Sequence, residues 1–230
     1  MTETVLPDWL LGKVNALLAL GGRRLLGLCG APGSGKSTLA AALKAALGEQ
    51  AVVVPMDGFH LAQVELERLQ RTARKGAPDT FDAAGYVALL RRLKAQPAGE
   101  IVYAPAFRRE IEEPVAGAIP AFAQTLLVIT EGNYLLLDGP WAPVRAELDE
   151  CWFVDTDEDK RVAWLLARHM RYGRSVEAAC AWIESTDAPN ARLVRATRDK
   201  ADFLVNIALE DKAAVPGNPL GASGDRRTQD

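Results

Sequence analysis

The sequence is poor in cysteine, histidine and aromatic residues, and it has no long apolar run. Its three cysteines, Cys29, Cys151 and Cys180, lie far apart without a CxxC spacing, which excludes a disulfide scaffold and indicates reduced thiols in a cytosolic protein. No apolar segment approaches the roughly 20 residues of a membrane span, so we expect no membrane partner. His60 and His169 have neither HxxxH spacing nor a partner cysteine, and therefore offer no zinc site.

The net charge of the chain is also small. A net charge of −3 argues against a nucleic-acid partner held by bulk charge. Residues 1–8 carry two acids and no base, unlike a secretory signal peptide, so we expect a cytoplasmic location. With 49% hydrophobic and 25% charged residues the chain has a globular composition, and we expect one domain over residues 1–210. Glycine, proline and charge dominate residues 216–230, and we expect a disordered tail over 211–230.

Short β-branched apolar runs alternate with longer helical patterns along the chain. The predicted strands cover residues 24–29, 51–56, 125–130, 151–154 and 203–207, and the predicted helices cover 8–20, 38–47, 83–93, 157–171, 175–185 and 188–198. The strand candidates are apolar on both faces, as buried parallel strands are. The order predicts an α/β fold with a parallel sheet. Proline-rich residues 101–122 interrupt this order and predict an excursion from the sheet, such as a hairpin.

The strongest motif follows the first predicted strand. Residues 30–37, GAPGSGKS, fit the pattern G-x-x-x-x-G-K-[ST], and Thr38 opens an Ala- and Leu-rich helix. Small residues let backbone N–H groups turn around a phosphate, and the helix N-terminus adds its positive dipole end. Lys36 would reach the β- and γ-phosphates, and the Ser37 hydroxyl would ligate Mg²⁺. An accidental glycine-rich turn is the alternative. The predicted nucleotide-binding residues are Gly30, Ala31, Pro32, Gly33, Ser34, Gly35, Lys36, Ser37 and Thr38.

Three carboxylates follow predicted strands, where functional groups gather in an open parallel sheet. Asp57 leaves the second strand into a glycine-containing turn near the phosphate loop, so we predict that it is the general base. We interpret Glu131 as a metal-side group that contacts Mg²⁺ through water. Each residue is alternatively a turn-forming or capping acid. Asp155 fits the start of a helix better than a catalytic role.

A basic stretch follows the fourth strand. Arg161, Arg168 and Arg171 fall on one helical face, and Arg174 follows Gly173. A mobile helix and loop with arginines can close over a nucleotide and neutralise the charge of a transferred group. We predict such a lid at about residues 168–187, with Arg168 and Arg171 as its catalytic residues. The alternative is the solvated face of a surface helix.

Four segments together resemble the pantothenate kinase and uridine kinase family of phosphate-loop kinases. They are residues 30–38, 55–60 (PMDGFH), 74–82 (RKGAPDTFD) and 131–138 (EGNYLLLD), and the likeness covers roughly residues 10–208. It is nearest to a short bacterial branch described as nucleoside/nucleotide kinase-like or sugar-transport-associated kinases. This combination of segments is far more specific than the phosphate loop alone.

The resemblance implies a doubly wound sheet of five parallel strands, Mg-ATP as donor, and a small-molecule alcohol as acceptor. It also places the general base at Asp57 and suggests that residues 74–76 and Phe81 help to line the pocket for the acceptor. Members of that branch carry an acid where this chain has Arg108, so substrate choice here is expected to differ. The predicted substrate residues are Asp57, His60, Arg74, Lys75, Phe81, Arg109 and Glu131, and the predicted metal residues are Ser37 and Glu131.

The sequence therefore predicts a kinase that transfers the γ-phosphate of ATP to a hydroxyl of a nucleoside, a sugar or a pantothenate-like molecule. Two alternatives remain open: a nucleotide kinase with a phosphate acceptor, and an ATP-binding regulatory module without transfer activity. A regulatory module has no need of a carboxylate such as Asp57 beside the γ-phosphate. A homodimer is also left open.

Overall fold

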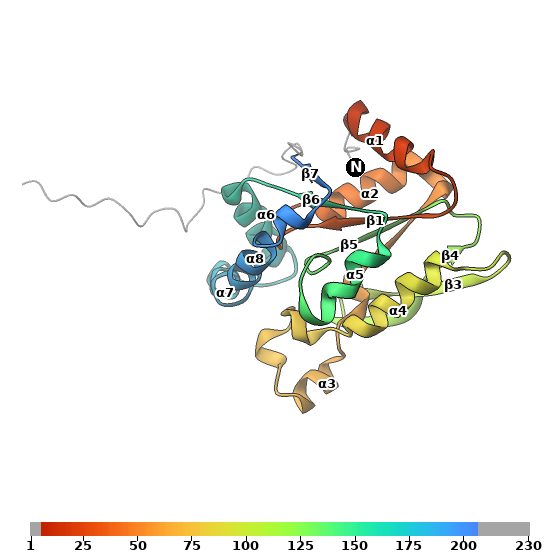
Figure 1. Cartoon of the computed structure of the whole chain (residues 1–230). Coiled ribbons are helices and arrows are strands. Elements are labelled where there is room, and N and C mark those ends of the chain that lie inside the picture. The colour runs from red at the N-terminus through yellow and green to blue at the C-terminus, as the bar shows by residue number, and fades with distance from the viewer. Residues whose placement is uncertain (1–5, 207–230) are drawn as a thin grey trace, which may run out of the picture.

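The computed structural model describes residues 6–206. Its main feature is a five-stranded sheet in the order β2-β5-β1-β6-β7, in which every neighbouring pair is parallel (Figure 1). The strands are β1 (Arg24–Cys29), β2 (Ala51–Pro55), β5 (Leu127–Gly132), β6 (Glu150–Val154) and β7 (Phe203–Val205). The predicted doubly wound parallel sheet is confirmed. The tail predicted at 211–230 lies outside the described residues.

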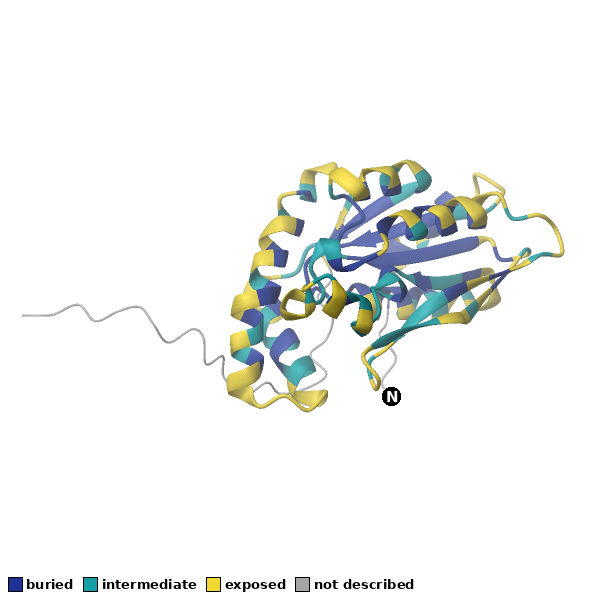
Figure 2. Ribbon diagram, turned by 90° about the horizontal axis from the view of Figure 1, so that it is seen from below, coloured by how far each residue is buried: buried dark blue, intermediate teal, exposed yellow. Residues whose placement is uncertain are grey.

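Helices cover both faces of this sheet because its strands are apolar on both sides. Leu26 and Leu28 of β1 pack with α1 (Asp8–Leu18) and α2 (Lys36–Leu47). Leu25 and Cys29 face the opposite layer, which includes α4 (Ala83–Lys94), α5 (Ala142–Glu147) and Val194 of α8 (Ala188–Arg195). Figure 2 shows the buried strands between these partly exposed helices. The two cores hold the carboxyl ends of the strands in a fixed arrangement.

The proline-rich excursion forms an antiparallel hairpin of β3 (Ile101–Arg108) and β4 (Glu113–Phe122). The register shifts between Ala104 and Ala106, next to Pro105, because proline cannot donate to the ladder. Pro105 packs against the short 3₁₀ turn Met56–Phe59 that follows β2: a Cβ on Gly58 would meet the Pro105 carbonyl oxygen at 2.4 Å. The hairpin is therefore fixed beside the turn that carries Asp57.

Three helices form a separate layer on one side of the molecule: α6 (Glu158–Arg171), α7 (Val176–Trp182) and α8 (Figure 1). A single π-helical turn, Ile183–Asp187, joins α7 to α8. Their small apolar core consists of Leu165, Leu166, Ala179 and Ile183. We call residues 158–195 the lid layer.

The short helices α3 (Gln63–Arg68) and α5 were not predicted, whereas the glycine-containing turn expected at Asp57 is the 3₁₀ turn Met56–Phe59. All three cysteines are free, and burial raises the pKa of the Cys29 thiol to about 11, as expected of an inert core thiol. Within residues 6–206, no helix has both the length and the apolar character needed to cross a bilayer.

Leu90 tests the packing that supports the site. Leu90 lies on α4, and its side chain is fully buried between that helix and the sheet. Leu90→Ala should therefore lower the free energy of unfolding by about 2–5 kcal/mol. Leu193→Ala is the matched control, since Leu193 is 40% exposed on α8. Urea titration of both variants checks this, and equal losses in the two would contradict the assigned core.

Candidate active site

The predicted phosphate loop connects β1 to α2, as the motif requires. Gly33 and Gly35 have φ of +83° and +88°, which residues with a side chain rarely adopt. A Cβ on Gly33 would also meet the Arg161 carbonyl oxygen at 2.9 Å. The loop therefore needs glycine at Gly33 for two reasons, its backbone angle and the close approach of α6.

The side chain of Lys36 folds back onto the start of the phosphate loop. Its Nζ donates to the carbonyl oxygens of Gly30 and Ala31 at 2.9 and 3.0 Å. Burial lowers the pKa of Lys36, while the negative charge of Glu131 opposes that effect. The ammonium group thus occupies the concave side of the loop, where phosphate oxygens can replace the two carbonyl contacts.

Ser37, in the first turn of α2, lies beside Glu131, near the end of β5. Ser37 Oγ donates to Glu131 Oε1 at 2.9 Å. Burial raises the pKa of Glu131, and the nearby charge of Asp57 raises it further. A hydroxyl beside a carboxylate provides the oxygen donors that Mg²⁺ prefers. Within residues 6–206 no group of three or more His, Cys, Asp or Glu side chains could hold a metal ion.

Asp57 stands on the 3₁₀ turn after β2 and is partly buried. Its Oδ2 lies 3.6 Å from Nη2 of Arg109, which comes from the turn of the β3–β4 hairpin. The charge of Asp57 acts on the pKa values of Lys36, Glu131 and Arg168. The structure therefore brings the predicted base into the same charged group as the phosphate loop and the lid layer.

An aromatic stack borders Asp57. The His60 ring lies between Phe81 and Phe107, with centroids 4.0 and 4.5 Å away, and its Nδ1 is 2.8 Å from the Asp57 carbonyl oxygen. Burial lowers the pKa of His60, which favours the neutral ring. Lys75 lies 5.7 Å over the Phe107 ring and donates to the Glu112 carbonyl oxygen at 2.6 Å. The predicted substrate residues His60, Phe81 and Lys75 thus belong to one cluster with Phe107, beside Asp57.

Three other residues named from the sequence lie outside this group. Arg74 is ion-paired to Asp79 at 2.7 Å and its side chain is 54% exposed, so the structure does not bring it to Asp57. Arg108 is exposed at the end of β3. Asp155 is paired with Arg198 at 2.9 Å and does not cap the following helix, whose N-cap is Asp157.

The basic helix α6 carries arginines with different environments. Arg161 is 1% exposed and donates to the Pro32 carbonyl oxygen at 2.7 Å and to both Glu158 carboxylate oxygens. Arg168 is partly buried, and its pKa is lowered by burial and by the charge of Arg109. Arg171 is exposed, and Arg174 stacks on Trp182 at 4.2 Å. Of the two predicted lid arginines, only Arg168 lies within the charged group.

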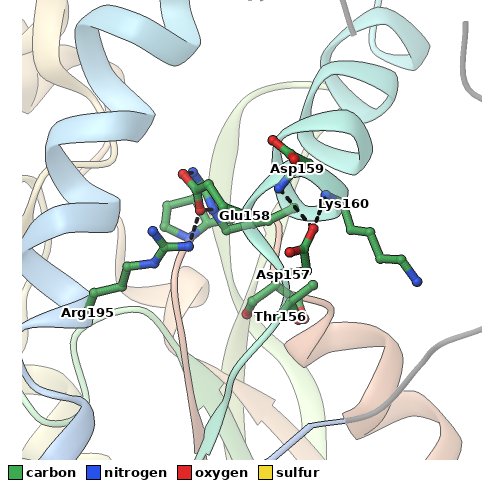
Figure 3. Close-up of polar contacts among 9 residues, drawn as sticks. Thr156, Asp157, Glu158, Asp159, Lys160 and Arg195 are labelled. Atoms are coloured by element: carbon green, nitrogen blue, oxygen red, sulfur yellow. Dashed lines mark hydrogen bonds and ion pairs between the residues drawn. The ribbon is translucent and has the colours of Figure 1, made fainter. Parts of the chain in front are cut away.

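The first turn of α6 explains how this helix is held. Asp157 caps it by accepting bonds from the N–H groups of Asp159 and Lys160, and Arg195 of α8 contacts Glu158 (Figure 3). These bonds hold α6 together and join it to α8, whereas the Arg161–Pro32 contact fastens α6 to the phosphate loop. Arg161 was not predicted as a structural link, since sequence spacing alone does not distinguish a buried arginine from an exposed one.

These features define a phosphate-loop fold with a charged site at the carboxyl ends of its strands. A sequence profile of the Phosphoribulokinase / Uridine kinase family matches residues 25–213, and the chain belongs to that family. Membership makes it an ATP-dependent kinase, because phosphoryl transfer from ATP to a small molecule is the activity that this family implies.

Comparisons with individual proteins support this family assignment. An ATP-dependent kinase-like protein of Aspergillus versicolor is 35% identical over 74% of this chain and 99% of its own length. A provisionally assigned uridine kinase of Schizosaccharomyces pombe is 36% identical over 72% of this chain and 74% of its length. The solved structure of a provisionally assigned fructose transport system kinase from Silicibacter sp. TM1040 superposes with a TM-score of 0.75 at 39% identity, covering 84% of this chain and 97% of that one.

Glu131 gives a pH-dependent prediction. Because its pKa is raised in the folded protein, its negative charge opposes folding above that raised pKa, and this cost disappears as the pH falls and the carboxyl group is protonated. Glu131→Gln should therefore raise the melting temperature of the ligand-free protein at pH 7–8, and the gain should shrink towards pH 5. Thermal unfolding across this range checks it. A gain that is the same at every pH would contradict a buried charge at Glu131.

Proposed function

We propose that this protein transfers the γ-phosphate of ATP to a hydroxyl group of a small metabolite: a nucleoside, a sugar or a pantothenate-like molecule. The observation that carries this proposal is the position of Asp57, a partly buried carboxylate whose charge acts on both Lys36 and Glu131. Phosphoryl transfer to an alcohol requires such a group to orient or deprotonate the hydroxyl. The free, mostly buried thiols fit the cytoplasmic location proposed from the sequence.

On the donor side, the phosphate loop binds ATP. Lys36 exchanges its two carbonyl contacts for β- and γ-phosphate oxygens, and the loop amides and the start of α2 receive the remaining charge. Ser37 would bind Mg²⁺ directly and Glu131 through water. A Mg²⁺ ion held by these residues would supply Lewis-acid chemistry that neutralises negative charge on the phosphates.

On the acceptor side, Asp57 accepts the proton of the attacking hydroxyl. Arg109, 3.6 Å from its Oδ2, holds the carboxylate in place. His60, Phe81 and Lys75 form the wall against which the acceptor packs. Arg168 stabilises the charge on the transferred group, as a guanidinium does through paired hydrogen bonds to phosphate oxygens. The exposed Arg171 joins it when the lid layer closes.

Asp57→Asn tests the base. The change keeps the size and removes the charge, so turnover should fall by about 10²–10⁴ while ATP affinity stays within a few-fold. Asp155→Asn is the control, because Asp155 also follows a central strand but is paired with Arg198. Coupled ADP-release assays with a panel of nucleosides, sugars and vitamins, together with calorimetry for ATP, check it. An equal loss of ATP affinity would instead make Asp57 a metal or structural residue.

Variants of Arg109 and Arg171 distinguish an effect on the choice of acceptor from an effect on phosphoryl transfer itself. Arg171→Ala should lower turnover by a similar factor for every accepted alcohol, since a guanidinium recognises phosphate oxygens whatever the acceptor. Arg109→Ala should lower turnover for every acceptor, because Arg109 holds Asp57, and should in addition change the ranking of acceptors by roughly ten- to a hundredfold for those that it contacts. The same acceptor panel measures both. Unchanged relative rates in Arg109→Ala would remove the hairpin from the acceptor site.

A further inference from the structure

A closed ring of contacts joins Asp57 to two cationic side chains, Lys75 and Arg109. The Asp57 carbonyl oxygen lies 2.8 Å from His60 Nδ1, and the His60 ring lies 4.5 Å from the Phe107 ring. Lys75 Nζ is 5.7 Å from the Phe107 ring and donates to a carbonyl oxygen in the turn between β3 and β4 at 2.6 Å. Arg109, in the same turn, returns to Asp57 at 3.6 Å. An acceptor whose hydroxyl reaches Asp57 therefore lies beside two positive charges.

The ammonium group of Lys75 is not neutralised by a carboxylate. Within residues 6–206 its Nζ forms no ion pair, and it donates instead to two uncharged oxygens, the Glu112 carbonyl at 2.6 Å and Gln63 Oε1 at 3.4 Å. The carboxylate of Glu113 accepts the backbone N–H of Gln63 at 2.9 Å and does not pair with Lys75. The half-buried Lys75 thus keeps a positive charge that a ligand can use.

The guanidinium group of Arg109 has unused donors. Its Nη2 is 3.6 Å from Asp57 Oδ2, which is too long for a hydrogen bond, and the group makes no hydrogen bond to any part of the chain that the structure describes. Its Cζ lies 5.6 Å from the ring of Tyr172, the residue that ends α6. Aromatic rings thus hold both cations, Tyr172 for Arg109 and Phe107 for Lys75, and a ring attracts a cation without neutralising it.

The aromatic rings of this cluster are engaged with one another. A nucleobase is commonly held by stacking on an aromatic face. Here the His60 ring already lies between Phe81 at 4.0 Å and Phe107 at 4.5 Å, and Lys75 lies over Phe107. Phe81 also makes an edge contact with Tyr134 at 5.6 Å. The cluster therefore offers an acceptor positive charge rather than a stacking surface.

We propose that the acceptor is an alcohol that carries a carboxylate or phosphate group, and that Lys75 and Arg109 bind this group while Asp57 receives the hydroxyl. This inference rests on the proposed transfer to a hydroxyl and narrows its substrate class. Hydrogen bonds from ammonium and guanidinium groups to anionic oxygens are shorter and stronger than those between neutral groups. Binding of the anionic group thus fixes the distance of the hydroxyl from Asp57, and neutral sugars and nucleosides lack that attachment.

Matched acceptors test the proposal in the unmodified protein. Protein saturated with AMP-PNP and Mg²⁺ is titrated by calorimetry with two pairs: pantothenate and pantothenol, in which a hydroxymethyl group replaces the carboxylate, and fructose 6-phosphate and fructose. Uridine represents the neutral nucleosides. The anionic member of one pair should bind roughly ten- to a hundredfold more tightly than its neutral partner and than uridine, and the pair concerned distinguishes a carboxylate from a phosphate. Equal binding within both pairs, no binding of either anion, or preference for uridine would overturn the proposal.

Variants of Lys75 connect this preference to the side chain. Lys75→Gln keeps a nitrogen that can donate to the Glu112 carbonyl oxygen but removes the charge. It should weaken binding of the preferred anionic acceptor roughly ten- to a hundredfold and leave the affinity for AMP-PNP within about twofold. Lys75→Arg keeps the charge and should lose less. An unchanged preference in a folded Lys75→Gln variant would overturn the role of Lys75.

Lys44→Gln is the matched control for these variants. Lys44 also donates to a backbone carbonyl oxygen, that of Gly48, at 2.6 Å, but it lies in the last turn of α2, at the opposite end of that helix from the phosphate loop. Its replacement should leave every affinity unchanged. If Lys75→Gln does not fold, as its melting curve would show, the matched acceptors in the unmodified protein still decide the proposal.

Transfer of label from [γ-³²P]ATP to the same compounds separates this inference from the proposed function. Label that passes only to neutral alcohols would overturn the anionic acceptor and leave the proposed kinase activity intact. Selective binding of an anionic acceptor without transfer would contradict the proposed activity and support the anion site. Label on the anionic member that binds most tightly would support both.

Discussion

Parallel pairing of β2, β5 and β1 is the constraint on which the site depends. In this register Glu131 lies opposite Leu28 of β1 and Pro55 of β2. Because parallel strands end at the same edge of the sheet, the loop after β1 and the turn after β2 must meet Glu131 there. The contact of Ser37 with Glu131 and the influence of Asp57 on its pKa both follow from this register.

Because these loops and strand ends meet at one edge of the sheet, several charged side chains are buried close to one another. Burial raises the pKa of Glu131 and lowers those of Lys36 and Arg168, so each charge is maintained against a cost. Opposite charges nearby offset part of this cost: Glu131 acts on Lys36, and Arg109 forms an ion pair with Asp57 at 3.6 Å. In the proposed reaction, the phosphates and the metal complete this balance. A site of this kind exchanges folding stability for function.

Sequence reasoning found the strands and the positions of Lys36, Ser37, Asp57 and Glu131, because the phosphate-loop motif and apolar runs fix local structure directly. It did not find the contact of Arg161 with the phosphate loop, since that contact depends on how α6 packs against the rest of the chain. Arg74 shows a further limit: whether a cation faces a site or a surface partner such as Asp79 is decided by tertiary contacts. No periodicity indicates a single inserted residue such as that of the π turn.

The most direct measurement follows the phosphorus atom itself. Purified protein is incubated with [γ-³²P]ATP, Mg²⁺ and each member of an acceptor panel, and labelled products are separated and characterised. The account predicts that one class of alcohol acquires the label as an acid-stable phosphomonoester, and that Lys36→Ala abolishes this transfer. Label found only in a phosphoanhydride would identify a nucleotide kinase. No transfer to any acceptor despite tight ATP binding would indicate a regulatory module, and either result would contradict the proposed transfer to a hydroxyl.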